Sequence, residues 1–203
     1  MDKENPDLEN SGEKNLEIPP IELLREELAR EELKYAFRRT LWNIMVILIV
    51  VAAITALVAT RLFVLIQIKG NSMEPAMADG EIVFIRQTKE VEQGEIVGFY
   101  YGGRILLKRV IGSAGDHINI DGDGNVYING EMLEEPYVAE KNLGKCELEF
   151  PYEVPEGMVF VLGDNRSVSI DSRIRSIGCV EREQIVGKAV FRAWPMARMG
   201  MIH

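Results

Sequence analysis

The hydrophobic and polar positions divide the chain into regions with different patterns. Residues 1–20 are polar, are interrupted by proline and contain almost no large apolar side chain, so we predict a disordered tail. Residues 21–40 are rich in helix formers, and their apolar positions make a rough helical stripe. This segment is either an amphipathic helix on a membrane surface or an extension of the helix that follows it. Its many glutamates favour the extension.

Residues 41–60, LWNIMVILIVVAAITALVAT, are twenty consecutive positions without a charge. At about 1.5 Å rise per residue such a helix spans ~30 Å, the thickness of the hydrocarbon core of a bilayer. The segment is longer than the apolar region of a cleaved signal peptide, and it lacks an A-x-A exit. The rest of the chain is too polar to surround it as a core helix. We therefore predict one uncleaved transmembrane helix in the cell membrane.

Basic side chains flank this span unequally. Four precede it within a dozen residues and two follow it: Arg30, Lys34, Arg38 and Arg39, then Arg61 and Lys69. Basic residues concentrate on the cytoplasmic side of membrane spans. We expect the N-terminus and the juxtamembrane helix 21–40 to be cytoplasmic, and residues 61–203 to be extracytoplasmic.

Residues 61–203 have a different texture from the span. Short β-branched runs alternate with Gly, Asp and Asn at spacings of around ten residues, and no helical stripe of a dozen residues occurs. Such spacing is typical of a hairpin-rich, all-β domain. The predicted fold class is therefore mostly β: an antiparallel sheet domain behind one N-terminal transmembrane helix.

Charge and composition narrow the possible partners. The chain has 32 acidic and 23 basic residues, a net charge of −9, which argues against a nucleic-acid partner. Two histidines and two cysteines leave little from which to build a metal site, and no nucleotide-binding fingerprint is present. We expect neither a metal nor a cofactor. Cys146 and Cys179 are either a disulfide or two separate thiols.

The first stretch that carries candidate chemistry is Gly70-Asn-Ser72-Met-Glu-Pro75. A serine between glycine and proline is usually a turn residue, but such a loop also exposes a nucleophile on a rigid support. Gly70 would let a substrate backbone approach closely, and the Ser72 N–H could point at a developing oxyanion.

The second stretch is the apolar strand Arg104-Ile-Leu-Leu-Lys-Arg-Val-Ile-Gly112. Alternation places Lys108 on one face with apolar neighbours and Arg109 on the other. Either the Lys108 side chain reaches water, or its burial lowers its pKa and makes it a general base. The third stretch, residues 163–173, is dense in hydrogen-bonding groups: it is either a surface turn or a polar network beside a site.

In this order, behind a membrane span, these stretches resemble the bacterial type I signal peptidases, which are Ser-Lys proteases. GNSMEP is similar to their nucleophile box, LLKRVIGSAGD to their lysine box and GDNRSVSIDSR to their last box, and GEIVGF resembles the box between. The likeness runs from the span to about Gly187. The single span resembles the Gram-positive members.

The resemblance assigns roles at these positions. Ser72 would be the nucleophile, Lys108 the general base, and Ser169 the group that orients the Lys108 amine. The serine needs a base other than histidine, and lysine is a known variant.

Further residues would support the site or line it. The resemblance implies that Asp171 and Arg173 form a bracing salt bridge and that Asp164 supports the same loop. Met73 would line the substrate cleft, next to Gly70.

The sequence departs from the family pattern at three places. Ala76-Met77 stand where Thr-Leu is usual, which would alter the cleft floor. Gly70 stands where some members have a hydroxyl that donates to the oxyanion, so only backbone N–H groups remain. Between Arg173 and Gly178 the loop is longer than usual.

The resemblance also implies the substrates: secretory preproteins with small residues at positions −1 and −3, bound as an extended strand. Two alternatives remain. One is a catalytically silent paralogue that binds signal peptides, which intact Ser72, Lys108 and Ser169 argue against. The other is a sortase-like Cys transpeptidase built on His117 and Cys179, although Cys179 lacks that family's sequence context.

Overall fold

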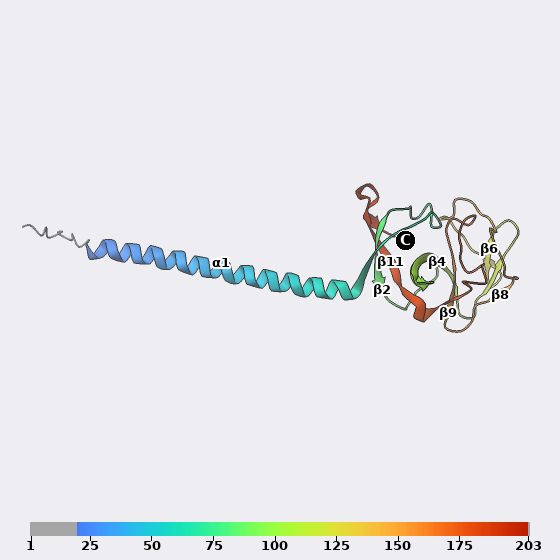
Figure 1. Cartoon of the computed structure of the whole chain (residues 1–203), viewed down its shortest axis with the longest axis horizontal. Helices are drawn as coiled ribbons and strands as arrows, with labels where there is room; N and C mark the ends of the chain where they lie inside the picture. The colour runs from blue at the N-terminus through green and yellow to red at the C-terminus, as the bar shows by residue number, and fades with distance from the viewer. Residues whose placement is uncertain (1–19, 203) are drawn as a thin grey trace, which may run out of the picture. The chain divides into compact units, whose positions relative to one another are not determined.

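The computed structural model describes residues 20–202, and the chain divides between Thr55 and Ala56 into two compact units. The tail predicted for residues 1–20 lies outside the described residues except for Pro20. Figure 1 shows one long helix and one β-rich body.

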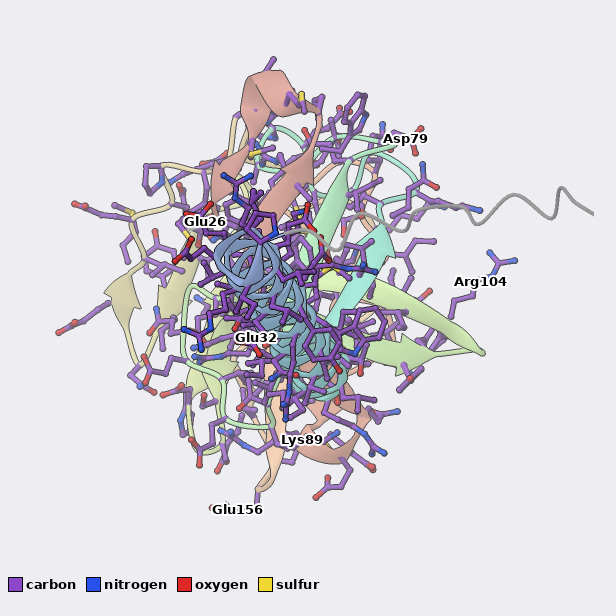
Figure 2. The ribbon with its side chains drawn as sticks, turned by 90° about the vertical axis from the view of Figure 1, so that its left-hand side faces the viewer. Glu26, Glu32, Asp79, Lys89, Arg104 and Glu156 are labelled. Atoms are coloured by element: carbon purple, nitrogen blue, oxygen red, sulfur yellow. The ribbon has the colours of Figure 1, made fainter. Side chains whose placement is uncertain are left out.

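Helix α1 (Ile21–Leu62) is continuous over 42 residues, about 63 Å at the usual rise. The segment predicted as a juxtamembrane extension and the segment predicted as a span are therefore one helix. None of its side chains is buried, and charged ones such as Glu26 and Glu32 are exposed (Figure 2). Among residues 20–202 it is the one helix long and apolar enough to cross a membrane, with a mean hydropathy of 2.7 in its most apolar window.

Two antiparallel sheets make up the β-rich unit. The strands of the larger sheet have the order β1-β2-β11-β3-β4-β9-β10, with β12 paired to β11. They are β1 (Phe63–Gln67), β2 (Ile82–Gln87), β3 (Ile96–Tyr101), β4 (Arg104–Ser113), β9 (Met158–Leu162), β10 (Val180–Glu181), β11 (Ile185–Trp194) and β12 (Gly200–Met201). The smaller sheet has the order β7-β6-β5-β8: β5 (His117–Ile120), β6 (Val126–Ile128), β7 (Glu131–Met132) and β8 (Tyr152–Glu153). Two 3-10 turns flank β11: η1 (Arg182–Gln184) and η2 (Met196–Arg198). The predicted fold class, mostly antiparallel β, is confirmed.

Strand β4 lies in the middle of the larger sheet and positions the candidate lysine. It pairs with β3 on one side, where Lys108 is opposite Val97, and with β9 on the other, where Arg109 is opposite Leu162. The chain leaves β9 at Leu162, so residues 163 and 164 follow directly beside Arg109. The register thus brings the second and third candidate stretches together.

The apolar core supports the loop that contains Ser72. Met73 and Met77, one and five positions after Ser72, are buried in a cluster with Ile85 and Leu107. Burial of a methionine side chain contributes about 1.5–3 kcal/mol. The apolar side chains of the loop therefore fix it to the sheet.

Candidate active site

The loop between β1 and β2 holds Ser72 through contacts at both of its ends. Gly70 has φ +90, a left-handed conformation that favours glycine, and its N–H donates to Asp79 Oδ1 at 2.6 Å. The Ile68 N–H donates to the Glu81 carbonyl at 2.8 Å. These contacts close the loop on itself, so the position of Ser72 is fixed by the backbone.

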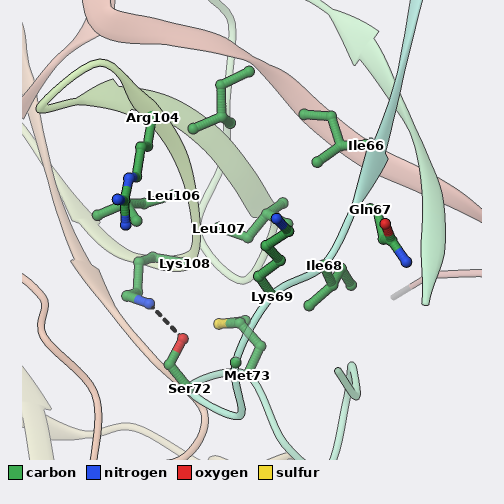
Figure 3. A pocket seen from close by; sticks show the side chains of 12 residues that line it. Ile66, Gln67, Ile68, Lys69, Ser72, Met73, Arg104, Leu106, Leu107 and Lys108 are labelled. Carbon is green, nitrogen blue, oxygen red and sulfur yellow. Dashed lines mark hydrogen bonds between the residues drawn. The ribbon is translucent and has the colours of Figure 1, made fainter. Parts of the chain in front are cut away.

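Ser72 and Lys108 meet at the centre of the site. Lys108 Nζ lies 2.7 Å from Ser72 Oγ (Figure 3), and only 3% of the lysine is exposed. Burial lowers the pKa of Lys108 to about 8, although the carboxylates of Asp171 and Asp164 raise it. Near that pH a large fraction of the amine is neutral, and its lone pair can accept the Ser72 proton across the same contact.

Ser169 is next to this pair but does not bond to it in this structure. Its hydroxyl is buried and has no hydrogen-bond partner among residues 20–202. A Cβ on Gly163 would collide with Ser169 Oγ and would stand 2.5 Å from the Ser72 carbonyl oxygen, so glycine allows these two segments to approach. The role of orienting Lys108 stays a prediction for Ser169.

Asp171 and Arg173 form a fully buried, two-pronged ion pair. Arg173 Nε and Nη2 each lie 2.8 Å from a carboxylate oxygen of Asp171. Asp171 also accepts a hydrogen bond from the Gly163 N–H at 3.0 Å, and Arg173 Nη2 donates to the Arg166 carbonyl at 2.9 Å. The pair fixes the segment on which Ser169 stands.

Asp164 pairs with Arg109, a residue to which the sequence analysis gave no role. Arg109 Nε and Nη2 lie 2.9 and 2.7 Å from the Asp164 carboxylate oxygens, and its Nη1 donates to the Gly94 carbonyl at 2.6 Å. The guanidinium lies 3.9 Å from the centre of the Tyr137 ring. Because Arg109 follows Lys108 on β4, this pair fixes the strand on which the lysine stands.

Glu135 is a second site residue that the sequence did not reveal. It is buried, pairs with Arg166 and accepts a hydrogen bond from the Tyr137 hydroxyl at 3.2 Å. Glu135 stands in a loop with other acidic residues, and nothing in the sequence distinguishes it from them. Together with Arg109, it ties this loop to the segment around Asp164.

A fourth ionic group restrains the loop between β1 and β2 that carries the candidate nucleophile Ser72, called the nucleophile loop below. Buried Glu81 lies 2.8 Å from Arg192 Nε and 2.6 Å from Arg198 Nη1. Arg192 also donates to the Ala76 carbonyl, and Arg198 donates to the Pro75 carbonyl at 3.1 Å. Strand β11 and turn η2 thereby restrain the backbone three and four positions beyond Ser72.

Two adjoining hollows of about 470 and 500 Å³ open at the Ser72–Lys108 pair. The first is walled mainly by β1 and β4 and includes Met73, and the second includes Val168, Ile170 and Ile177. Both share the same central lining: Lys69, Gly70, Ser72, Arg104, Leu106 and Lys108. Figure 3 shows the side chains that line the first hollow, with Lys108 and Ser72 side by side.

The described residues hold no group of three or more His, Cys, Asp or Glu side chains that could bind a metal ion. Cys146 and Cys179 are free thiols in this structure. Burial raises the pKa of Cys179 to about 11, so its thiol stays protonated at neutral pH.

Comparison with known proteins places this geometry in a family. Residues 40–194 match the sequence profile of the family described as signal peptidase, peptidase S26. Signal peptidase I of Streptococcus pneumoniae serotype 4 is 32% identical over 174 residues, which cover 66% of this chain and 84% of that protein. Signal peptidase IB of Staphylococcus aureus strain Mu50 is 36% identical over 151 residues, 64% of this chain and 77% of that protein.

Among solved structures, a crystal structure of a signal peptidase I from Enterococcus faecalis V583 is similar, with 33% sequence identity and a TM-score of 0.43. It covers 49% of this chain and 96% of that chain. The family profile and the curated relatives show that this chain belongs to the signal peptidases of the S26 family, as a bacterial type I signal peptidase: a serine peptidase that removes signal peptides.

Proposed function

We propose that the protein cleaves secretory preproteins with Ser72 as nucleophile and Lys108 as general base. The observation that carries this proposal is the 2.7 Å contact between a buried lysine amine and the hydroxyl of a serine on a restrained loop. A serine without a neighbouring base is a weak nucleophile at neutral pH, and a desolvated lysine supplies that base.

The reaction proceeds through an ester acyl-enzyme. Neutral Lys108 accepts the Ser72 proton while Oγ attacks the scissile carbonyl carbon, and the Ser72 N–H donates to the oxyanion. Protonated Lys108 then gives its proton to the leaving amine, and the peptide bond breaks. Lys108, neutral again, takes a proton from a water molecule that attacks the ester carbon. It gives this proton to Ser72 Oγ as the ester bond breaks, which frees the serine and releases the new C-terminal carboxyl group.

The substrate lies extended between β1 and β4, with small residues at positions −1 and −3. Main-chain pairing with exposed strand edges holds such a peptide, while side-chain pockets select it. Gly70 and Met73 line the first hollow and limit the side chains that enter it.

The α1 helix anchors the enzyme in the bilayer with its N-terminus in the cytoplasm, on the side that its flanking basic residues favour.

The test is cleavage of a secretory precursor in detergent by the full chain and by two variants, Ser72→Ala and Lys108→Ala, each checked for folding by circular dichroism. We expect the wild type to cut after the small residue at position −1. The rate of cleavage by each variant should be lower by at least about a thousandfold. Cleavage that survives in folded Ser72→Ala would overturn the assignment of the nucleophile.

The same experiment separates the alternatives. A Cys transpeptidase predicts loss of activity on Cys179→Ala, which the protonated, half-buried Cys179 thiol argues against. A silent paralogue predicts binding of the precursor with no cleavage by the wild type.

A further inference from the structure

We propose that Lys69 and Arg104 select substrates with an acidic side chain three or four residues from the scissile bond. The inference rests on the proposed cleavage at Ser72 and adds to it a charge preference of the cleft. It comes from the placement of two cations on the central lining shared by both hollows.

Both cations are carried by the same backbone segments that carry the reacting groups. Side chains alternate along a strand, so Arg104, Leu106 and Lys108 share one face of β4, and all three line the cleft. Arg104 stands four residues before Lys108, about 13 Å along the strand. Lys69 stands three residues before Ser72 on the opposite side of the opening (Figure 3). An extended peptide beside β4 has the same rise per residue, so its third or fourth residue from the scissile bond comes level with Arg104.

The carboxylates near this part of the cleft do not offset its positive charge. Among residues 20–202, no Asp or Glu lines either hollow, although the chain has a net charge of −9. Asp164 and Asp171 are bound by Arg109 and Arg173 in buried ion pairs. Asp79, at the end of the nucleophile loop, accepts from the Gly70 N–H and is not part of the lining.

Within residues 20–202, no carboxylate neutralises either cation. Lys69 and Arg104 are exposed, and neither has an ion pair or side-chain hydrogen bond to any other residue of the part that the structure describes. Figure 2 shows Arg104 extending well away from the ribbon. Two such cations on facing walls attract a carboxylate on the bound chain and repel a lysine at the same place. Charged groups of this kind contribute more to the choice between substrates than to the affinity for any one of them.

The test uses one precursor in which Asp, Asn or Lys is placed in turn at each position from four before to four after the scissile bond, the positions −1 and −3 excepted. We expect one position, three or four residues from the bond, at which the wild type prefers Asp over Lys by about five- to tenfold in kcat/KM, because the site is partly open to solvent. The preference should shrink as ionic strength rises from about 0.05 to 0.5 M.

Charge reversal gives the sharper result. The double variant Lys69→Ala/Arg104→Ala should lose the preference, and Lys69→Glu/Arg104→Glu should reverse it in favour of Lys. The matched control is Lys145→Ala/Arg86→Ala, which removes two exposed cations that do not line the hollows and should keep the wild-type preference.

Equal cleavage of the Asp and Lys substrates by the wild type, or a preference that persists in Lys69→Ala/Arg104→Ala, would overturn the inference. Binding of the same peptides to Ser72→Ala gives a second measurement that does not require cleavage. If the wild type cuts nothing, the proposed function fails, whereas the dissociation constants still support or refute the charge preference.

Discussion

The two units of this chain place apolar and charged side chains in opposite ways. Helix α1 exposes its apolar side chains: Trp42, Ile47 and Leu48 are each more than 60% exposed. The β-rich unit instead encloses charge, with Arg109, Arg166 and Arg173 no more than 2% exposed.

The contrast fits the membrane anchor that we propose, in which each unit has a different solvent. Uncovered apolar side chains over the length of a bilayer indicate lipid as the surrounding medium, because water would not tolerate such a surface. A buried guanidinium group is tolerated only where carboxylate and carbonyl oxygens accept hydrogen bonds from its N–H groups. In this protein those pairs surround the strand and the loops that hold Ser72 and Lys108, so the charge is buried where geometry matters most.

The largest effect is expected from breaking a buried pair. Arg173→Ala leaves the Asp171 carboxylate buried without its cation, and the free energy of unfolding should fall by about 3–5 kcal/mol. Urea unfolding in detergent, followed by far-UV circular dichroism, measures it. The control is Lys34→Ala on α1, which removes a pair to Glu31 whose side chains are 67% and 71% exposed, and which should leave the transition unchanged. If Arg173→Ala unfolded at the same urea concentration as the wild type, the buried pair would not stabilise the β-rich unit.

A charge placed in the exposed apolar stretch tests the other unit. Val50→Arg should oppose membrane insertion by about 2.5–3.5 kcal/mol, the penalty for a charge near the centre of a spanning helix. Leu28→Arg lies in the part of α1 that is already charged and serves as the control. The measurement is the fraction of protein that remains in membranes after alkaline extraction. Equal retention of both variants would remove the argument that residues 41–60 face lipid.

A smaller effect is expected at the ion pairs that restrain the nucleophile loop. Arg192→Ala leaves buried Glu81 with one partner and frees the Ala76 carbonyl, so stability should fall by about 1–3 kcal/mol and kcat should fall with it. Unfolding and steady-state kinetics measure the two quantities. Lys188→Ala on the same strand removes a half-buried pair to Glu95 that does not touch the loop, and its kcat should match the wild type. Equal losses in kcat for both variants would show a general effect of β11 rather than a local one.

The pH dependence reports the burial of Lys108 directly. Only the neutral amine accepts the Ser72 proton, and its pKa is lowered to about 8, so kcat/KM should fall about tenfold per pH unit below pH 8. Each such unit corresponds to ~1.36 kcal/mol. Rate measurements between pH 5 and 9 at constant ionic strength test this. A midpoint near pH 6.5 would point to a histidine instead.

The sequence by itself predicted what depends on neighbours along the chain. The uncharged residues 41–60 predict a span from their length, and alternation in short runs predicts strands. Alternation also placed Lys108 and Arg109 on opposite faces of β4. The three stretches around Ser72, Lys108 and Asp171 identified the family, because their residues are close together in the chain.

The tertiary structure decided which charges meet. Arg109 and Asp164 are 55 residues apart, Glu135 and Arg166 are 31 apart, and Arg192 reaches a carbonyl 116 positions away. An arginine that will be buried in a pair has the same local sequence signature as one that will remain in water. Whether it is buried depends on which strands become neighbours, so the partners of Glu81, Glu135 and Arg109 emerge only when β4, β9 and β11 lie in their final order. The absence of a partner for Lys69 and Arg104 within residues 20–202 was decided in the same way: a cation is unpaired only if no distant carboxylate folds against it.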